Sequence, residues 1–290
     1  MLALLMGAVW AGGCATGPNN PSFPLTSADA EDDIRRMEDQ PRELPRPVVV
    51  LTGWADPFFG SAYWKDALLD VGVPREQILP MSFFFNTSFA GCRERVVTAV
   101  QQRWPSDDPD ATVEVDVIGF SMGGLIGRLS AAPARDPDRD PRRLRVRRLF
   151  TISSPHRGAK LAKLSLDPLM IDRRIVEMKP GSATLAYLDQ QRGTPGNDYQ
   201  IVAYARSADW VIGNERSAPP GQTAYWVPTP FLHRPHQEAY RDARIEADIL
   251  RRLRGETPWT TPDPAPWPDA DPPRRPAPAA NANASSNPHP

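Results

Sequence analysis

The chain alternates between short apolar runs and stretches in which apolar residues recur every three or four positions. An uninterrupted apolar run is typical of a strand buried on both faces, whereas the wider spacing is typical of a helix with one buried face. The first pattern predicts strands at residues 48–51, 78–83, 113–118, 144–152, 200–205 and 224–227. The second predicts helices at residues 63–71, 93–104, 122–131, 182–190 and 236–253. Because the two alternate, we expect an α/β fold: a mostly parallel sheet with helices on both faces.

Both ends of the chain lack this alternation. Residues 1–10 are almost wholly apolar and precede the run Ala-Gly-Gly-Cys that ends at Cys14. Such a stretch is too short to cross a bilayer as a helix, and it suits the apolar region of a secretory signal. At the other end, residues 256–290 hold 11 of the 34 prolines and show no apolar periodicity. They are expected to form a disordered tail, with docking of Trp259 and Trp267 onto the domain as the alternative.

The ends of the alternating region divide the chain into four parts, and its composition excludes some kinds of partner and site. We expect a signal segment at residues 1–14, a spacer at 15–46 that is compatible with a short helix at 34–37, one folded domain at 47–255 and the tail at 256–290. The formal net charge of −1 and the pI near 6.4 give no reason to expect nucleic acid as a partner. No CxxC motif or Cys/His cluster occurs, so no metal site is expected.

An export prediction rests on Cys14. A cysteine directly after Ala-Gly-Gly resembles the lipobox of bacterial lipoproteins, in which that cysteine is lipidated and becomes the mature N-terminus. The match departs in two ways, since no Lys or Arg precedes the apolar run and Ala11 stands where Leu is usual. The resemblance implies an exported protein, a periplasmic or cell-envelope lipoprotein held at a membrane surface. Cys92 is then expected to be a small residue of helix packing, with a Cys14–Cys92 disulfide as the alternative.

The run Gly119-Phe120-Ser121-Met122-Gly123 fits the pattern G-x-S-x-G. A chain of this length contains that pattern by chance about once in ten, so its context decides. It directly follows the predicted strand 113–118 and precedes an apolar helix, which is the setting of a nucleophile elbow. In such a sharp turn the serine hydroxyl projects clear of the sheet, and larger side chains at the two glycines would collide with the turn. The pattern therefore predicts Ser121 as a nucleophile.

The histidines narrow the choice of a base that would activate this serine. Of the four, His289 lies in the tail and His156 follows the predicted strand 144–152. In the chain order Ser, Asp, His, the base comes late and before the final helix. That leaves His233 and His236, between which the residue pattern does not choose.

A carboxylate must orient the base, and Asp209 is the best placed. It follows the predicted strand 200–205, so it is expected at the same edge of a parallel sheet as the serine turn, where the apolar residues after it can bury it. Asp198 precedes that strand, and Asp189 lies in a predicted helix. The alternative interpretation of Asp209 is a surface turn residue.

Two backbone N–H groups are predicted to form an oxyanion hole. One belongs to Met122, the residue after the nucleophile. The other belongs to Trp54, in the run Thr52-Gly53-Trp54 that closes the predicted strand 48–51. Gly53 would let this backbone come close to a substrate.

Residues 115–125, VDVIGFSMGGL, resemble the nucleophile strand and turn of the bacterial lipase and esterase branch of the α/β-hydrolase family. The likeness extends over roughly residues 46–253 and includes the segments ISSPHRG (152–158), SAD (207–209) and ADIL (247–250). It implies the α/β-hydrolase fold, with residues 47–255 as a catalytic domain that cleaves carboxylic esters through an acyl-enzyme. It also implies a structural role for His156. It favours His236 over His233, because the catalytic histidine of such lipases precedes the ADIL-like helix by a fixed interval.

Two positions depart from that branch. Thr52-Gly53 stands where His-Gly is usual, and Phe120 stands where the turn usually has His. Neither departure removes a reacting group.

Aromatic residues after the predicted strand ends bear on the substrate. Phe58, Phe59 and Phe83 are predicted to line an apolar acyl pocket, with core packing as the alternative. The expected substrate is an ester or lipid-like small molecule, and the expected enzyme is a monomer without metal or organic cofactor. The alternatives are an acyltransferase, a thioesterase or an amidase with the same triad, or a catalytically inactive hydrolase-like scaffold.

Overall fold

The computed structural model describes residues 19–134, 141–160, 162, 172–230 and 232–267. Its centre is a six-stranded sheet in the order β2-β1-β3-β4-β5-β6, in which every neighbouring pair is parallel. The strands are β1 (Val48–Leu51), β2 (Ile78–Met81), β3 (Ala111–Phe120), β4 (Arg143–Ile152), β5 (Gln200–Arg206) and β6 (Tyr225–Val227). The prediction of an α/β fold with a parallel sheet is confirmed.

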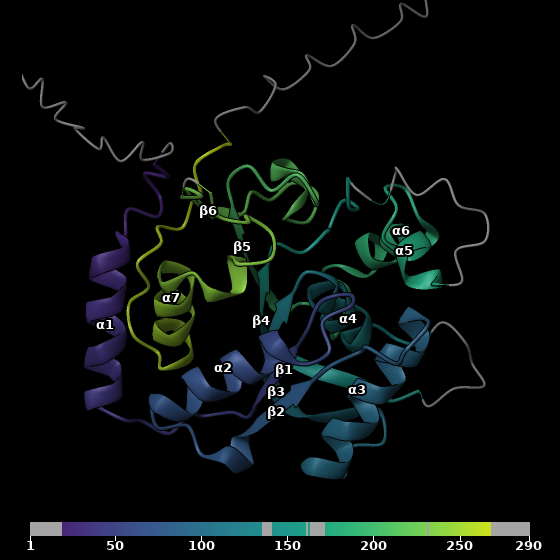
Figure 1. Ribbon diagram of the computed structural model, residues 1–290. Coiled ribbons are helices and arrows are strands. Elements are labelled where there is room, and N and C mark those ends of the chain that lie inside the picture. Colours follow the sequence, from purple (N-terminus) through teal and green to yellow (C-terminus); the bar gives the residue numbers. More distant parts are fainter. Residues whose placement is uncertain (1–18, 135–140, 161, 163–171, 231, 268–290) are drawn as a thin grey trace, which may run out of the picture.

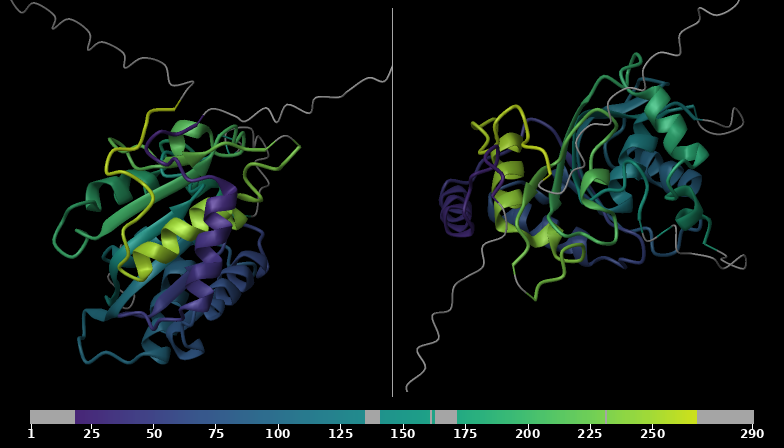
Figure 2. Two further views of the ribbon diagram at one scale, coloured as in Figure 1. Left: turned by 90° about the vertical axis from the view of Figure 1, so that its left-hand side faces the viewer. Right: turned by 90° about the horizontal axis from the view of Figure 1, so that it is seen from above.

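Helices cover both faces of the sheet (Figures 1 and 2). One face carries α1 (Ser27–Asp39), α2 (Phe59–Asp70) and α7 (Ala243–Leu253). The other carries α3 (Phe89–Arg103), α4 (Met122–Ala131), α5 (Arg173–Glu177) and α6 (Ala183–Gln191). Short 3-10 helices interrupt the connections at η1 (Arg75–Gln77), η3 (Asn214–Arg216) and η4 (Ala239–Arg241).

Each face of the sheet has its own core, because successive strand residues point to opposite faces. In β1, Val48 and Val50 pack in the cluster that includes α1, α2 and α7. Val49 and Leu51 pack in the cluster that includes α3, α4 and α6. This burial on both sides explains why β1 reads as an uninterrupted apolar run.

Cys92 lies in α3 and is fully buried in the second of these clusters. Burial raises the pKa of its thiol to about 12, as expected of a packing residue. Cys14 and the predicted signal segment lie outside the described residues. Within the described ranges, no helix is long and apolar enough to span a membrane.

The start of the predicted final helix, 236–253, is wrong. Helix α7 begins at Ala243, because the side chain of Asp242 caps it by accepting a hydrogen bond from the N–H of Arg244 at 3.2 Å. Residues 236–242 instead form turns and η4. His236 consequently lies on the connection between β6 and α7.

Both segments that flank the predicted domain pack against it (Figure 2). Helix α1 occupies the middle of the predicted spacer and packs on α7. Trp259 donates from its indole nitrogen to Asp33 Oδ2 at 2.8 Å, and Trp267 stacks on Trp226 with ring centroids 5.6 Å apart. The expectation of disorder is therefore wrong for residues 256–267, because two tryptophans and buried carboxylates anchor a segment without regular structure. Residues 268–290 lie outside the described part.

Candidate active site

Ser121 stands between the end of β3 and the start of α4, in a strained backbone conformation. Its φ of 51° lies in the left-handed region that most side chains avoid. The two glycines of the motif allow this turn. A Cβ on Gly119 would lie 2.6 Å from the Cα of Gly124, and a Cβ on Gly123 would lie 2.2 Å from the carbonyl oxygen of Leu51. The G-x-S-x-G pattern therefore forms the tight strand–serine–helix turn that the sequence predicts.

Three predicted side chains meet at this turn. Ser121 Oγ lies 3.1 Å from Nε2 of His236, and Nδ1 of the same ring lies 2.9 Å from Oδ2 of Asp209. The other carboxylate oxygen, Oδ1, accepts hydrogen bonds from the N–H groups of Val211 at 3.0 Å and Ile212 at 3.1 Å. Since a carboxylate can only accept, Nδ1 is the ring nitrogen that donates, and Nε2 is left free to accept the serine proton.

The alternative candidates lie elsewhere. His233 is half-exposed, and its Nδ1 lies 2.6 Å from Oε2 of Glu238. Asp189 pairs with Arg128 at 2.9 Å, and Asp198 precedes β5, at the opposite end of that strand from Asp209. Among the candidates weighed, the structure brings Asp209 and His236 to Ser121.

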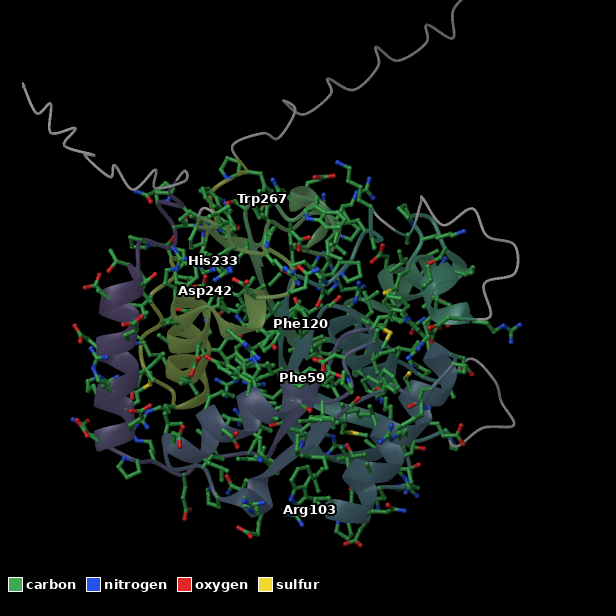
Figure 3. The ribbon with its side chains drawn as sticks, viewed as in Figure 1. Phe59, Arg103, Phe120, His233, Asp242 and Trp267 are labelled. Carbon is green, nitrogen blue, oxygen red and sulfur yellow. The ribbon has the colours of Figure 1, made fainter. Side chains whose placement is uncertain are left out.

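The ring of His236 packs against an aromatic pair. Phe120 lies 5.4 Å from the imidazole, centroid to centroid, at an interplanar angle of 34°, and Tyr240 lies 5.0 Å from Phe120. Figure 3 shows Phe120 near the centre of the molecule. Phe120 stands at the position where the turns that this segment resembles usually have His, and its ring packs against the imidazole of His236.

The loop after β1 lies against the serine. A Cβ on Gly53 would stand 3.1 Å from the Cβ of Ser121 and 3.3 Å from the ring of Phe120, so a larger residue here would have to displace these side chains by a few tenths of an ångström. Trp54 follows directly. Met122 is the first residue of α4, where the N–H groups of the first helical turn have no intrahelical partner. Both predicted oxyanion donors thus belong to backbone next to Ser121.

Comparison with known proteins gives structural likeness alone. No protein-family model matches the sequence, and no curated protein matches it significantly. A solved structure of phospholipase PlaB from Legionella pneumophila is 12% identical with a TM-score of 0.50, and the likeness covers 72% of this chain. This chain spans about 60% of the length of that one. The mature lipase BlEst2 from Bacillus licheniformis is 12% identical with a TM-score of 0.48, covering 76% of this chain and 94% of that one.

The parallel sheet, the strained serine between β3 and α4 and the chain order Ser, Asp, His are the marks of one architecture. The chain has the α/β-hydrolase fold. The loop that carries Trp54 follows β1, and β1 pairs directly with β3, the strand that ends at the serine turn.

The three residues predicted to line an acyl pocket differ in their exposure to solvent. Phe58 and Phe59 are 59% and 57% exposed, and their rings lie 5.2 Å apart. Phe83, by contrast, is fully buried in the core on the α3 side, so its predicted substrate contact is replaced by core packing. The next two residues of that loop, Phe84 and Phe85, are the exposed ones.

Exposed large apolar side chains concentrate at the edge of the sheet where Ser121 lies. Among the described residues they are Trp54, Phe58, Phe59, Phe84, Phe85, Val176, Trp210 and Leu232. All but Val176 follow the carboxyl end of a parallel strand, at β1, β2, β5 or β6. The candidate site therefore has an apolar rim, a name we keep for the seven of these residues that follow strand ends.

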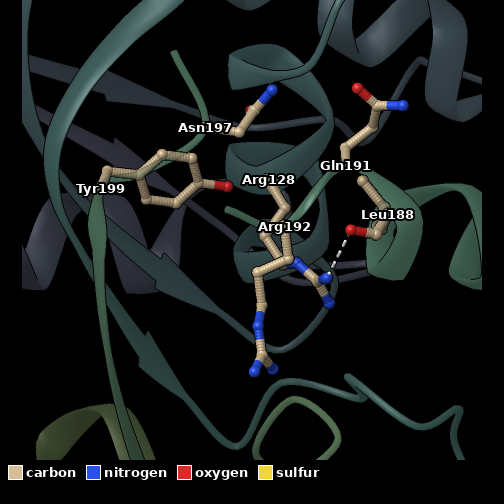
Figure 4. A pocket seen from close by; sticks show the side chains of 6 residues that line it. All are labelled: Arg128, Leu188, Gln191, Arg192, Asn197 and Tyr199. Carbon is tan, nitrogen blue, oxygen red and sulfur yellow. Dashed lines mark hydrogen bonds between the residues drawn. The ribbon is translucent and has the colours of Figure 1, made fainter. Parts of the chain in front are cut away.

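A separate pocket beside α4 and α6 contains none of the triad candidates. It is lined by Arg128, Leu188, Gln191, Arg192, Asn197 and Tyr199 (Figure 4). Arg128 is buried there and donates to the carbonyl of Leu188 at 2.9 Å. It also lies 3.3 Å from Nδ1 of His156, a fully buried ring whose pKa burial and the neighbouring Arg128 lower well below its usual value. No group of three or more metal-ligating residues occurs in the part of the chain that the structure describes.

Two residues that hold the site together were not predicted from the sequence. Tyr240 supports Phe120, and Arg206 at the end of β5 donates to Asp242 at 2.9 Å and to Glu238 at 3.4 Å. These contacts tie the strand that precedes Asp209 to the connection that carries His236. The one available signal was Arg206 itself, a charge that ends an apolar strand.

Proposed function

We propose that this protein is a serine hydrolase that cleaves carboxylic esters through an acyl-enzyme. The observation that carries the proposal is the continuous contact from Ser121 Oγ through His236 to Asp209, with distances of 3.1 Å and 2.9 Å. A buried, oriented imidazole can take the proton of a serine hydroxyl as that oxygen attacks a carbonyl carbon.

Each group has a defined task in the proposed cycle. His236 accepts the proton from Ser121 on Nε2 while a new bond forms between Oγ and the acyl carbon. Asp209 holds the ring by Nδ1 and stabilises its protonated form. The N–H groups of Met122 and Trp54 donate to the oxyanion of the tetrahedral intermediate.

The intermediate collapses when the bond to the alkoxy group breaks and His236 returns its proton to the departing alcohol. Water then attacks the acyl-enzyme with His236 as base, and the acid leaves. No metal or organic cofactor takes part in this proposal.

The apolar rim supports a lipid-like ester as the substrate. Exposed aromatic side chains next to a nucleophile offer apolar contact to an acyl chain, and each such contact removes apolar surface from water. A fold shared with a phospholipase is compatible with this substrate class. Phe58 and Phe59 remain our candidates for acyl contact.

Hydrolysis of p-nitrophenyl esters of increasing acyl length tests the proposal. We expect activity in the wild-type protein and a loss on the order of 10⁴-fold or more in kcat for Ser121→Ala and His236→Gln. His233→Gln is the matched control and should keep activity, because its ring contacts Glu238 instead. Activity that survives Ser121→Ala in purified protein would overturn the proposal.

Other outcomes separate the alternatives. Labelling of Ser121 by a fluorophosphonate probe distinguishes an enzyme from an inactive scaffold. If added alcohols or amines capture the acyl group faster than water does, the protein is an acyltransferase. Preference for a thioester over the matching oxygen ester would indicate a thioesterase.

We also propose that Cys14 is lipidated and holds this site at a membrane surface of the cell envelope. The support is the apolar segment and the Ala-Gly-Gly-Cys run. Mass spectrometry of the mature N-terminal peptide tests this proposal. An unmodified Cys14 in membrane-derived protein would contradict it.

A further inference from the structure

The side chain of Trp54 is held by a single carboxylate from a distant part of the chain. Its indole Nε1 donates to Oδ2 of Asp172 at 2.6 Å, across 118 positions of sequence. Asp172 also caps α5, since its Oδ1 accepts from the N–H of Arg174 at 3.0 Å. The contact therefore joins the loop after β1 to the start of α5.

Asp172 is itself fixed in place. Arg174 donates to both of its carboxylate oxygens, from Nε at 2.8 Å and from Nη2 at 2.6 Å. The remaining guanidinium nitrogen, Nη1, donates to the carbonyl of Phe83 at 2.6 Å. Burial acts to raise the pKa of Asp172, but the hydrogen bonds from Arg174 and Trp54 outweigh it and lower that pKa. The acceptor of the indole N–H is thus a stationary negative charge tied to the loop after β2.

The backbone of the same loop is confined on its other side. Gly53 lies against Ser121, and the neighbouring Ala55 has a φ of 58° in the left-handed region. The carboxylate of Asp56 then accepts from the N–H groups of the first two residues of α2, Phe59 at 2.7 Å and Gly60 at 2.9 Å. The peptide N–H of Trp54 therefore belongs to a short strained segment held at its two ends and by its indole.

We propose that Asp172 is a positioning residue for the oxyanion hole. By fixing the indole of Trp54 it holds the peptide N–H of Trp54 where that group donates to the oxyanion. The direction of a peptide N–H is fixed by the position of its backbone. It therefore depends on the contacts that hold its residue in place. This inference rests on the proposed function, because it needs an oxyanion to form at Ser121.

Three substitutions separate the indole contact from general stability. Asp172→Ala removes the acceptor, Asp172→Asn keeps an acceptor oxygen, and Trp54→Phe removes the indole N–H while keeping an aromatic ring. We expect Asp172→Ala and Trp54→Phe to lower kcat about 10- to 100-fold with KM little changed, and Asp172→Asn to retain most activity. In the double variant, kcat should be no lower than in the more impaired single variant, since both substitutions remove the same hydrogen bond between Trp54 and Asp172.

A trifluoromethyl ketone gives a readout that a merely structural role would not move. Its adduct with Ser121 carries an oxyanion, so its affinity should fall in proportion to kcat/KM across the series. The apparent pKa of the kcat/KM profile should stay unchanged, because the base is untouched. Trp104→Phe is the matched control. Trp104 lies at the end of α3, where its indole donates to the backbone carbonyl of Glu76, and loss of this hydrogen bond should leave kcat unchanged.

The possible results are distinguishable. Wild-type kcat and ketone affinity in both Asp172→Ala and Trp54→Phe would overturn the inference and leave the proposed function standing. Should Asp172→Ala fail to fold because Arg174 is left buried and unpaired, Trp54→Phe decides, since that side chain is 45% exposed. A wild-type protein that hydrolyses no ester overturns the proposed function, and the inference with it.

Discussion

Phe120 provides the surface on which the imidazole of His236 packs, with ring centroids 5.4 Å apart. An aromatic pair contributes about 0.5–1.5 kcal/mol beyond its burial. If that contact holds His236 toward Ser121, Phe120→Leu should lower kcat about 2- to 10-fold in folded protein, because it keeps apolar bulk but removes the ring. The measurement is kcat as a function of pH, with circular dichroism to verify folding.

Tyr240→Phe is the control for this prediction. It keeps the ring that lies 5.0 Å from Phe120 and removes only the hydroxyl, so kcat should stay within about 2-fold of the wild-type value. A Phe120→Leu variant with wild-type kcat at every pH would show that Asp209 alone orients the imidazole.

The residues with a chemical role could be predicted from the sequence, because few residue types can fill that role. The residues that only support them by contact could not. Ser121 and Asp209 could be proposed because few serines and acids fit a strand–turn setting in the required order. The same order left both His233 and His236, and the resemblance to bacterial lipases favoured His236. Tyr240 and Asp172 lie in or beside irregular connections, and no residue pattern links them to the site. Phe83 was predicted to line a pocket because position along the chain does not reveal which way a side chain turns after a strand ends.

Among the elements, the buried strands and the nucleophile helix were the most predictable. Helix α4 has the predicted bounds, because every one of its residues is buried and the serine turn fixes its start. Helix α1 was harder to predict, since Asp33 occupies one of its buried positions and interrupts the apolar pattern. That carboxylate is accommodated by Arg251 and the indole of Trp259, partners from sequence-distant segments that a local pattern cannot reveal.

The contact between α2 and α7 leads to a prediction about stability and pH. Glu246 of α7 is buried and hydrogen-bonded to the hydroxyl of Tyr63 in α2, and burial raises its pKa to about 7. Because this folded pKa lies above the ordinary value of 4.5, the folded protein binds the extra proton between the two values. Stability from this group is therefore fully present below pH 4.5 and is lost as the pH rises through 7.

Glu246→Gln keeps a neutral partner for Tyr63 and removes the titration. At pH 8 we expect the substitution to raise the free energy of unfolding by up to about 3 kcal/mol, which gives a higher Tm than that of the wild type. At pH 4.5 the two proteins should have nearly equal Tm values. Thermal unfolding at both pH values measures this, with the exposed Glu31→Gln as the matched control. A Tm lower than that of the wild type by the same amount at both pH values would contradict the prediction, because it would show that Glu246 takes up no proton between them.

At the scale of the whole molecule, the segment after α7 belongs to the folded unit. It returns across α1 and α7 and ends beside β6 (Figure 2). Asp248, which is fully buried, accepts from the backbone N–H groups of Trp259 at 2.6 Å and Thr260 at 3.1 Å. Trp267 in turn covers Trp226 of β6. The folded domain therefore extends beyond the limit at residue 255 that composition suggests.

Truncation tests this extended boundary. A chain that ends after Glu256 loses the Trp259 and Thr260 donors to Asp248 and the Trp267 cover on Trp226, whereas a chain that ends after Trp267 keeps all of them. Burial of each tryptophan is worth roughly 1.5–3 kcal/mol, and unpaired buried carboxylate oxygens add to the cost. We expect the shorter chain to unfold at least about 5 °C below the longer one, measured by thermal circular dichroism at one protein concentration. Equal Tm values would mean that residues 257–267 rest on the domain without stabilising it. A lower Tm with unchanged kcat at low temperature would mean that residues 257–267 stabilise the fold without shaping the candidate site.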